Sequence, residues 1–290
     1  MSRTDAGDVD VDGGLRLHVD RAAGRPGGAP PVLLLHGFTG SGETWRPLRD
    51  ALGGAYPTLA VDLPGHGRSG APADPARYAL DRTADDLARV LDACAIDRAA
   101  VLGYSFGGRA ALRLALRRPE RVAALVLESA SPGIADPAER AERAAADAAL
   151  ADAIERDGVP AFVDRWERLP LWASQDAMPA AVRARLRGAR LANDARGLAN
   201  SLRGAGTGAD APVLDALGGL RMPALLVAGA LDAKYVVLGR AMAGALPGAR
   251  LAVVPGAGHA VHLEQPDAFA GLVRAFLDET FRREPAPPGA

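Results

Sequence analysis

The sequence predicts an α/β protein with a mainly parallel sheet covered by helices, and two observations carry this prediction. Short apolar runs of the kind that form buried strands alternate with amphipathic stretches of helical spacing along most of the 290 residues. Between about residues 135 and 208 the alternation stops, since Ala, Arg, Glu and Asp dominate there and no strand-like run occurs. We therefore predict a set of helices inserted between two strands of one sheet.

The predicted strands fall in two groups, before and after the inserted helices. Each is a brief apolar run of buried-strand type. They cover residues 32–35, 58–61, 99–102, 123–127, 224–228 and 251–254. Residues 267–281 predict a closing helix. We assign 14–134 and 209–282 to the α/β core, 135–208 to a helical lid, and 1–13 and 283–290 to flexible termini.

A helix is predicted over residues 83–94, between the second and third strands. Thr83 is the expected N-cap, because Asp86 follows it three residues later. Cys94 is the only cysteine and has no partner for an internal disulfide. It falls in helical step with Leu87 and Leu91, which predicts a buried core thiol rather than a reactive one.

Composition limits the classes of partner. Hydrophobic residues make up 49% of the chain, enough for a sizeable core. A net charge of −1, from 34 basic and 35 acidic residues, argues against nucleic acid and anionic membranes as partners. The chain has neither a signal-peptide pattern nor an apolar run near the roughly 20 residues of a membrane span. We expect a cytoplasmic protein that is a monomer or a small homo-oligomer.

A Gly-x-Ser-x-Gly segment lies between a predicted strand and a predicted helix. Its residues are Gly103-Tyr104-Ser105-Phe106-Gly107, and the helical stretch 109–116 follows. In this setting the segment forms a sharp turn that lifts the serine hydroxyl above the sheet. Glycines are needed because the backbone passes close to the neighbouring strand and helix. Ser105 is therefore the predicted reactive serine, with a merely structural turn as the alternative.

A serine hydroxyl is inert at neutral pH unless a base takes its proton. His259 is the predicted base, because it lies in a glycine-bearing loop directly after the last predicted strand. The other four histidines have structural interpretations: His18 in a strand, His66 in a turn, His36 as a residue that shapes its loop, and His262 as a pocket-lining or surface residue.

The imidazole needs an acid that fixes its tautomer and stabilises its charged form. Asp232 follows the strand 224–228 across a short turn and gives the chain order Ser, Asp, His. Glu128, at the end of the preceding strand, is the competing acid. The expected oxyanion hole consists of the backbone N–H of Phe38, from the loop after strand 32–35, and that of Phe106, which follows the serine.

These pieces resemble the α/β-hydrolase superfamily over residues 32–276. A closer resemblance is to the menaquinone-pathway lyase family, 2-succinyl-6-hydroxy-2,4-cyclohexadiene-1-carboxylate synthase (the MenH family). The segments that carry it are 103–109 (GYSFGGR), 131–133 (SPG), 138–143 (AERAER), Phe162 with Trp166, 169–174 (LPLWAS) and 229–235 (GALDAKY). Because several of them lie in the predicted lid, they discriminate better than the serine, histidine and aspartate do.

The resemblance implies a lyase that eliminates pyruvate from 2-succinyl-5-enolpyruvyl-6-hydroxy-3-cyclohexene-1-carboxylate, without hydrolysis. The product would be 2-succinyl-6-hydroxy-2,4-cyclohexadiene-1-carboxylate. The Ser-His-Asp set would act as a base that removes a ring proton, and the oxyanion hole would stabilise a substrate carboxylate turned enediolate. No cofactor and no metal ion are expected.

The resemblance also implies a cationic pocket for this polycarboxylate. Arginine suits carboxylates because its planar fork pairs with them bidentately. Arg109 lies one helical turn after Ser105, and Arg143, Arg190 and Trp166 fall in the lid at positions that look like the family's substrate-binding residues. A solvated helix face is the alternative for each arginine, and lid packing for the tryptophan. Glu167 departs from the family, which tends to have an aromatic residue there, and a negative charge is unfavourable unless it points outward.

Two other functions stay open from the sequence. A carboxylesterase or carbon–carbon bond hydrolase would share the serine, histidine and aspartate, although such enzymes usually have a more apolar lid. A non-catalytic ligand-binding protein on the same fold is the alternative of another class, and the intact set of reactive residues argues against it. Aspartate-nucleophile enzymes do not fit a serine at this turn, and no dinucleotide fingerprint or phosphate loop occurs.

Overall fold

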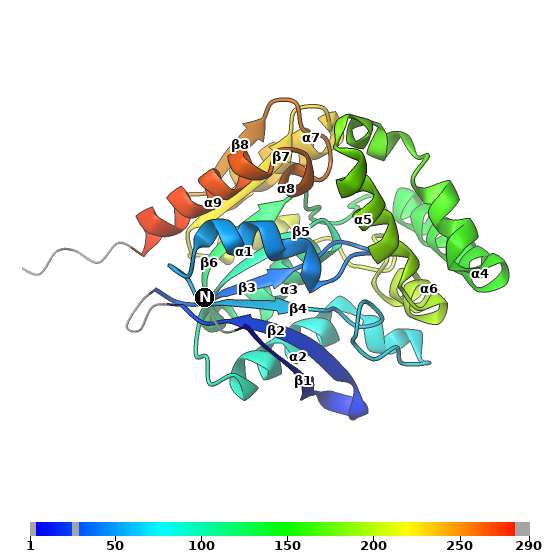
Figure 1. The fold of residues 1–290 in the computed structure, drawn as a ribbon, viewed down its shortest axis with the longest axis horizontal. Coiled ribbons are helices and arrows are strands. Elements are labelled where there is room, and N and C mark those ends of the chain that lie inside the picture. The colour runs from blue at the N-terminus through cyan, green and yellow to red at the C-terminus, as the bar shows by residue number, and fades with distance from the viewer. Residues whose placement is uncertain (1–3, 25–28, 282–290) are drawn as a thin grey trace, which may run out of the picture.

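The computed structural model describes residues 4–24 and 29–281 and contains one eight-stranded sheet with helices on both faces (Figure 1). Strand β2 pairs antiparallel with both β1 and β4, and all the other strand pairings are parallel. In spatial order the strands are β1 (Thr4–Asp10), β2 (Arg16–Ala22), β4 (Thr58–Val61), β3 (Val32–Leu35), β5 (Ala99–Tyr104), β6 (Val122–Glu128), β7 (Ala224–Gly229) and β8 (Arg250–Val254). The predicted mainly parallel α/β sheet is confirmed.

Two hydrophobic cores lie on opposite faces of this sheet because successive strand side chains point to opposite sides. Leu33 and Leu35 of β3 belong to one core, and Val32 and Leu34 to the other. Helices α2 (Leu80–Ala93), α3 (Phe106–Arg117) and α7 (Ala233–Ala245) cover the first core, and α1 (Arg46–Leu52), α8 (Val261–Glu264) and α9 (Pro266–Thr280) cover the second. Short 3-10 turns are η1 (Asp12–Gly14), η2 (Gly42–Trp45), η3 (Pro75–Tyr78), η4 (Pro119–Arg121) and η6 (Leu214–Gly219).

The helix predicted over 83–94 begins three residues earlier than expected. Its N-cap is Ala79, and Thr83 lies inside α2, where its hydroxyl donates to the Tyr78 carbonyl at 3.4 Å. The prediction of Thr83 as the N-cap was wrong because Leu80 is buried and pulls the first turn onto the core. Cys94 ends this helix and is partly rather than fully buried against the first core.

The chain between β6 and β7 forms helices, as the sequence predicts. They are α4 (Pro137–Trp166), the 3-10 helix η5 (Pro170–Ala177), α5 (Ala180–Leu191) and α6 (Ala195–Ala205), and we call these four elements the lid. They stand together on one side of the sheet (Figure 1). Asp136 caps α4 by accepting the N–H groups of Ala138 and Glu139, and a third apolar cluster joins α4 to α6. The lid therefore has a small core of its own.

The N-terminal residues depart from the prediction of a flexible terminus over 1–13. Residues 4–10 form β1, which pairs with β2 along its full length, and Val9 is buried in the first core. Backbone pairing and the burial of Val9 and Val11 order a segment whose polar composition suggested a tail. Residues 283–290, predicted to be flexible, lie outside the described residues. Among the helices that the structure describes, none is long and apolar enough to cross a membrane.

Candidate active site

Ser105 lies in the predicted sharp turn between β5 and α3. Its backbone has φ 51° and ψ −108°, a conformation that is uncommon for a residue other than glycine. A Cβ on Gly103 would overlap the backbone of Gly107, and one on Gly107 would overlap the carbonyl oxygens of Leu35 and His36. The two glycines are thus required by close backbone approach, as predicted, and the turn sets the serine side chain at the end of the strand.

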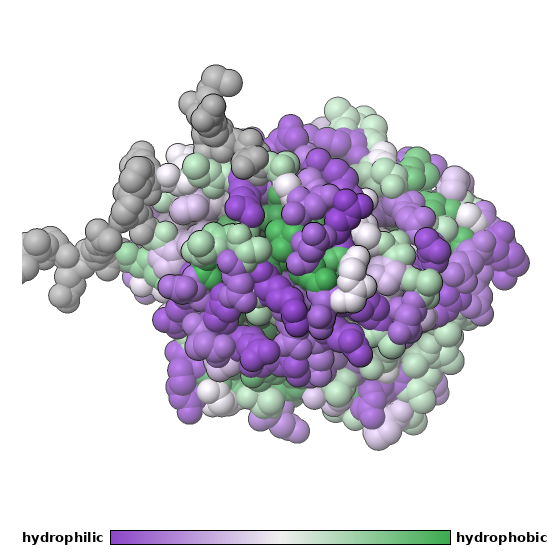
Figure 2. Space-filling model, turned by 90° about the horizontal axis from the view of Figure 1, so that it is seen from below, coloured by the Kyte–Doolittle hydropathy of each residue, from purple (hydrophilic) through white to green (hydrophobic). Residues whose placement is uncertain are grey.

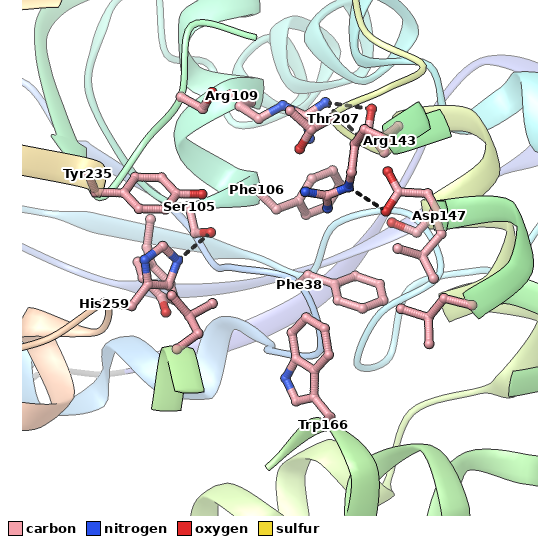
Figure 3. Close-up of a pocket in the computed structure, with 18 of the residues that line it drawn as sticks. Phe38, Ser105, Phe106, Arg109, Arg143, Asp147, Trp166, Thr207, Tyr235 and His259 are labelled. Atoms are coloured by element: carbon pink, nitrogen blue, oxygen red, sulfur yellow. Dashed lines mark hydrogen bonds and ion pairs between the residues drawn. The ribbon is translucent and has the colours of Figure 1, made fainter. Parts of the chain in front are cut away.

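His259 joins Ser105 to Asp232 through two hydrogen bonds (Figure 3 shows the serine and the histidine). Its Nε2 lies 3.0 Å from Ser105 Oγ, and its Nδ1 lies 2.7 Å from Asp232 Oδ2. Asp232 is the N-cap of α7, and its second oxygen accepts the backbone N–H of Tyr235 at 3.3 Å. The carboxylate is therefore held in place from both sides, and all three side chains extend from loops at the carboxyl ends of strands.

Glu128, the competing acid, has a different partner. Its Oε1 accepts the backbone N–H of His262 at 2.9 Å and lies 2.8 Å from Nδ1 of the same residue. Both side chains are buried, and His262 packs against Trp45 in the second core. His262 is thus neither a surface residue nor part of the cavity lining, and the acid of the Ser-His pair is Asp232.

Aromatic rings surround the imidazole of His259, which is only 2% exposed. The ring centroid of Tyr235 lies 4.4 Å away, and those of Trp172 and Tyr104 each lie 5.5 Å away. Burial, with Asp232 nearby, raises the pKa of Tyr235. Water therefore has little access to the imidazole except through the cavity above Ser105.

The two predicted oxyanion-hole amides lie on either side of the turn. Phe106 is the first residue of α3, so its N–H has no acceptor within the helix. Among the described residues, neither this N–H nor that of Phe38 has a backbone acceptor. Both phenyl rings line the cavity, and the Phe38 ring packs 5.6 Å from Trp166 of the lid. These two amides are free to receive negative charge.

His36 holds the loop that carries Phe38. Its Nδ1 donates to the Gly37 carbonyl at 2.8 Å, so its Nε2 is the nitrogen that accepts the Leu63 N–H at 2.9 Å. Burial lowers the pKa of His36 to about 4 and that of the neighbouring His66 to about 3. Both are therefore neutral at physiological pH, and the predicted structural roles fit these contacts.

A cavity of about 210 Å³ opens above Ser105, with walls from the core and the lid (Figure 3). Three of the four predicted substrate-binding residues, Arg109, Arg143 and Trp166, line it. Further lining residues include Ser131, Trp172, Lys234 and Tyr235, which lie in the segments 131–133, 169–174 and 229–235, and Thr207, which lies outside them. The sequence had given none of these five a role in the site. Their positions in the sequence could have identified most of them: Ser131, Lys234 and Tyr235 follow the ends of predicted strands, and Trp172 lies in the predicted lid.

Arg109 connects α3 to the end of the lid and the residues that follow it. Its guanidinium donates to the carbonyls of Ala205 and Gly206 at 2.8 and 3.1 Å and to the Thr207 hydroxyl at 3.2 Å. It also forms an ion pair with Asp210 at 3.3 Å. Burial lowers the pKa of Arg109, and Asp210 counteracts the shift. Much of its hydrogen-bonding capacity is thus used within the protein.

Arg143 is more open to the cavity. Its Nε donates to Asp147 at 2.8 Å, one turn further along α4, and the side chain is 44% exposed. Neither terminal amino group contacts an acceptor in the described part of the chain. Arg143 can therefore offer two N–H groups to an anionic ligand while Asp147 holds it in position.

Arg190 does not line this cavity, contrary to the prediction. Its guanidinium pairs with Glu167 at 2.9 Å, contacts Gln175 at 3.3 Å and lies over the Trp172 ring at 5.4 Å. It borders a separate pocket behind that ring. Glu167 also pairs with Arg187, so its negative charge is neutralised by two arginines away from the cavity. The ion pair with Glu167 thus holds Arg190 outside the cavity.

Within residues 4–24 and 29–281, no group of three or more His, Cys, Asp or Glu side chains is arranged to hold a metal ion. The chemistry that the described residues offer is proton transfer by Ser105 and His259, stabilisation of an oxyanion by two amides, and binding of anions by the cations of the cavity.

Comparisons with known proteins agree with this geometry. The family model described as alpha/beta hydrolase fold matches residues 30–266. A Bacillus subtilis (strain 168) protein named "Putative 2-succinyl-6-hydroxy-2,4-cyclohexadiene-1-carboxylate synthase" is 41% identical over 93% of this chain and 97% of its own length. The synthase of that name from Serratia proteamaculans (strain 568) is 32% identical, over 86% of this chain and 93% of its own.

Among solved structures, MenH from S. aureus superposes with a TM-score of 0.87 at 31% identity, over 90% of this chain and 98% of that one. Fold and sequence therefore point to the same group of proteins. The chain belongs to the α/β-hydrolase fold family and, within it, to the family of the 2-succinyl-6-hydroxy-2,4-cyclohexadiene-1-carboxylate synthases.

Proposed function

We propose that the protein is a carbon–oxygen lyase that eliminates pyruvate from 2-succinyl-5-enolpyruvyl-6-hydroxy-3-cyclohexene-1-carboxylate to give 2-succinyl-6-hydroxy-2,4-cyclohexadiene-1-carboxylate. The observation that carries the proposal is the union of a Ser-His-Asp array with a cationic cavity in one site. A hydrolase needs the array, whereas a substrate with several carboxylates needs the cations as well. The names and identities of the relatives support the same reaction.

The change in ring double bonds locates the proton that must leave. The substrate has a double bond between ring carbons 3 and 4, and the product has two, between carbons 2 and 3 and between carbons 4 and 5. Carbon 2 therefore loses a proton, the double bond shifts, and the carbon 5–oxygen bond breaks with its electron pair leaving on enolpyruvate. Enolpyruvate then takes up a proton to become pyruvate. Because carbon 2 carries the succinyl ketone, the ketone oxygen receives the negative charge, rather than the carboxylate expected from the sequence alone.

Each residue of the array has a distinct part in this proposal. Asp232 holds His259 with Nδ1 protonated, so that Nε2 can accept the proton of Ser105 Oγ. The serine oxygen then removes the proton from carbon 2, and no covalent bond to the substrate forms. The amides of Phe38 and Phe106 stabilise the enolate oxygen. Arg109 and Arg143 hold carboxylates and so orient the ring.

The test supplies purified protein with the proposed substrate and follows pyruvate with a coupled dehydrogenase. A parallel assay uses p-nitrophenyl acetate, an ester without a carboxylate. We expect rapid pyruvate release and slow ester cleavage. Fast ester cleavage without pyruvate would instead establish a carboxylesterase or a related hydrolase on the same array.

Composition supports a cytoplasmic location and a small-molecule substrate, with neither nucleic acid nor membrane as a partner. A monomer or a small homo-oligomer suffices, because core and lid of one chain enclose the cavity. Light scattering on the protein as it elutes from a size-exclusion column measures the oligomeric state, and cell fractionation measures the location.

A further inference from the structure

One residue of the cavity has a chemical identity found nowhere else in the chain. Thirty-four residues are lysine or arginine, and Lys234 is the only lysine among them. The sequence therefore uses arginine at every other position that carries a permanent positive charge. The cavity above Ser105 is lined by 20 of the 290 residues, and the single lysine is one of them. Random placement would seldom produce this coincidence.

The positive charge of Lys234 does not stabilise the helix that contains it. It lies in the first turn of α7, two residues after the N-cap Asp232. A cation there is opposed by the helix dipole, whose positive end lies at the N-terminus. The first turn of α7 also contains no acidic residue that would compensate. Helix stability therefore gives no reason for a lysine at this position.

Lys234 also differs from the two arginines of the cavity in its charge balance. Arg109 forms an ion pair with Asp210 at 3.3 Å, which Arg113 shares, and Arg143 forms one with Asp147 at 2.8 Å. Within the described ranges, Lys234 forms no ion pair, and its one recorded contact is the Tyr235 ring, 6.0 Å from Nζ. That ring in turn packs against His259. As far as the described residues go, Lys234 is thus the only one of the cavity's lysine and arginine side chains without a carboxylate partner, and the Tyr235 ring lies between it and His259 in this chain of contacts.

We propose that Lys234 is a specificity-determining residue whose ammonium group binds a carboxylate of the substrate at the mouth of the cavity. The inference rests on the proposed function and deepens it, because it assigns the anion-binding role that Arg190 does not fill. An ammonium on a four-carbon stem is a compact charge that can follow a carboxylate as it enters, whereas the guanidinium of Arg109 is fixed by its own partners.

Three variants test this role by steady-state kinetics. K234Q removes the charge, K234R keeps it, and R240Q removes an exposed charge from the same helix outside the cavity. We expect K234Q to raise KM for the polycarboxylate substrate about fivefold or more, with a smaller change in kcat, because a binding interaction is lost. K234R should recover most of the loss, and R240Q should behave as the wild type. An unchanged KM in K234Q would overturn the inference.

Because Lys234 is unique, its amine can also be followed chemically. Reductive methylation with formaldehyde modifies amines, and mass spectrometry separates the peptide of Lys234 from the N-terminal peptide, whose α-amine is the internal control. We expect succinate, a small dicarboxylate probe, to slow methylation of Lys234 several-fold and to leave the α-amine unaffected. Equal rates with and without succinate would contradict carboxylate binding.

The two experiments separate the failure of the inference from the failure of the proposed function. If the wild type releases no pyruvate but succinate protects Lys234, the reaction is wrong and the anion site stands. If the wild type releases pyruvate while K234Q keeps its KM and succinate gives no protection, the reaction stands and the lysine has no role in recognition.

Discussion

At the scale of single residues, the proposed chemistry depends on one hydrogen bond, the 3.0 Å contact between Ser105 Oγ and His259 Nε2. Exchange of Ser105 for alanine removes the oxygen that acts as the base, and we expect kcat for pyruvate release to fall by about 10²–10⁴-fold. The Asp232→Asn variant should lose a comparable factor, because an amide cannot hold the required tautomer. Turnover by S105A near that of the wild type would exclude the serine as the base.

Two histidines outside the reaction give a prediction about stability. An unfolded histidine has a pKa near 6.5, whereas burial lowers the pKa of His36 to about 4 and that of His66 to about 3 in the fold. Between pH 6.5 and 4 the unfolded chain therefore binds protons that the folded chain does not. The free energy of unfolding should fall as pH decreases through this window, by about 1.4 kcal/mol per unit for each histidine well below pH 6.5.

Urea unfolding between pH 5 and 6.5 measures this effect, since carboxylates contribute less in that range. The His66→Gln variant should show about half of the slope of the wild type. A wild-type stability that is constant over this range would contradict the neutral, buried state of both rings.

At the scale of elements, the turn between β5 and α3 sets the geometry of the site. Gly107→Ala would place a Cβ against the carbonyl oxygens of Leu35 and His36, which belong to β3 and its loop. We expect a loss of about 3 kcal/mol or more, or a failure to fold. Gly271→Ala is the matched control in α9, where a Cβ meets nothing within 4 Å. It should stabilise the protein by about 0.5–1 kcal/mol. Thermal and urea unfolding compare the two, and similar stabilities would disprove the close approach.

Arg109 links the lid to the core, so its loss should affect stability as well as the proposed substrate binding. Arg109→Gln would leave the carbonyls of Ala205 and Gly206 without this donor and would leave Asp210 paired with Arg113 alone, so we expect a loss of about 2–3 kcal/mol together with a lower kcat/KM. Arg117→Gln on the same helix removes only exposed ion pairs and should cost about 0.5 kcal/mol. If Arg109→Gln lowers kcat/KM without lowering the unfolding temperature, its lid contacts do not contribute to stability.

Sequence patterns predicted elements best where burial decides the structure. The runs 32–35 and 58–61 are the strands β3 and β4 without any shift, because buried strands need continuous apolar residues. The N-cap prediction failed because Thr83, although its residue type favours capping, lies inside α2. The burial of Leu80 sets the start of this helix. The position of Arg190 was not predicted because its ion pair with Glu167 joins lid residues far apart in the sequence, and such pairing leaves no periodic signal.

At the scale of the whole molecule, one sheet brings together residues from distant parts of the chain. Ser105, Asp232 and His259 follow three different strands and meet because parallel strands end at the same edge. The lid adds one cation, Arg143, to that edge. The space-filling view of one face shows hydrophilic side chains over most of the surface (Figure 2). A polar exterior around a cavity with fixed cations suits a small, highly charged substrate.

The most direct test of the central claim is the mass of the ring product formed from the enolpyruvyl substrate, measured beside pyruvate release. Elimination predicts a ring product whose mass equals that of the substrate minus pyruvate, formed in step with pyruvate and abolished in S105A. A ring product heavier than this by one water, which hydrolysis of the enol ether would give, or a product whose formation does not depend on Ser105, would contradict the lyase assignment.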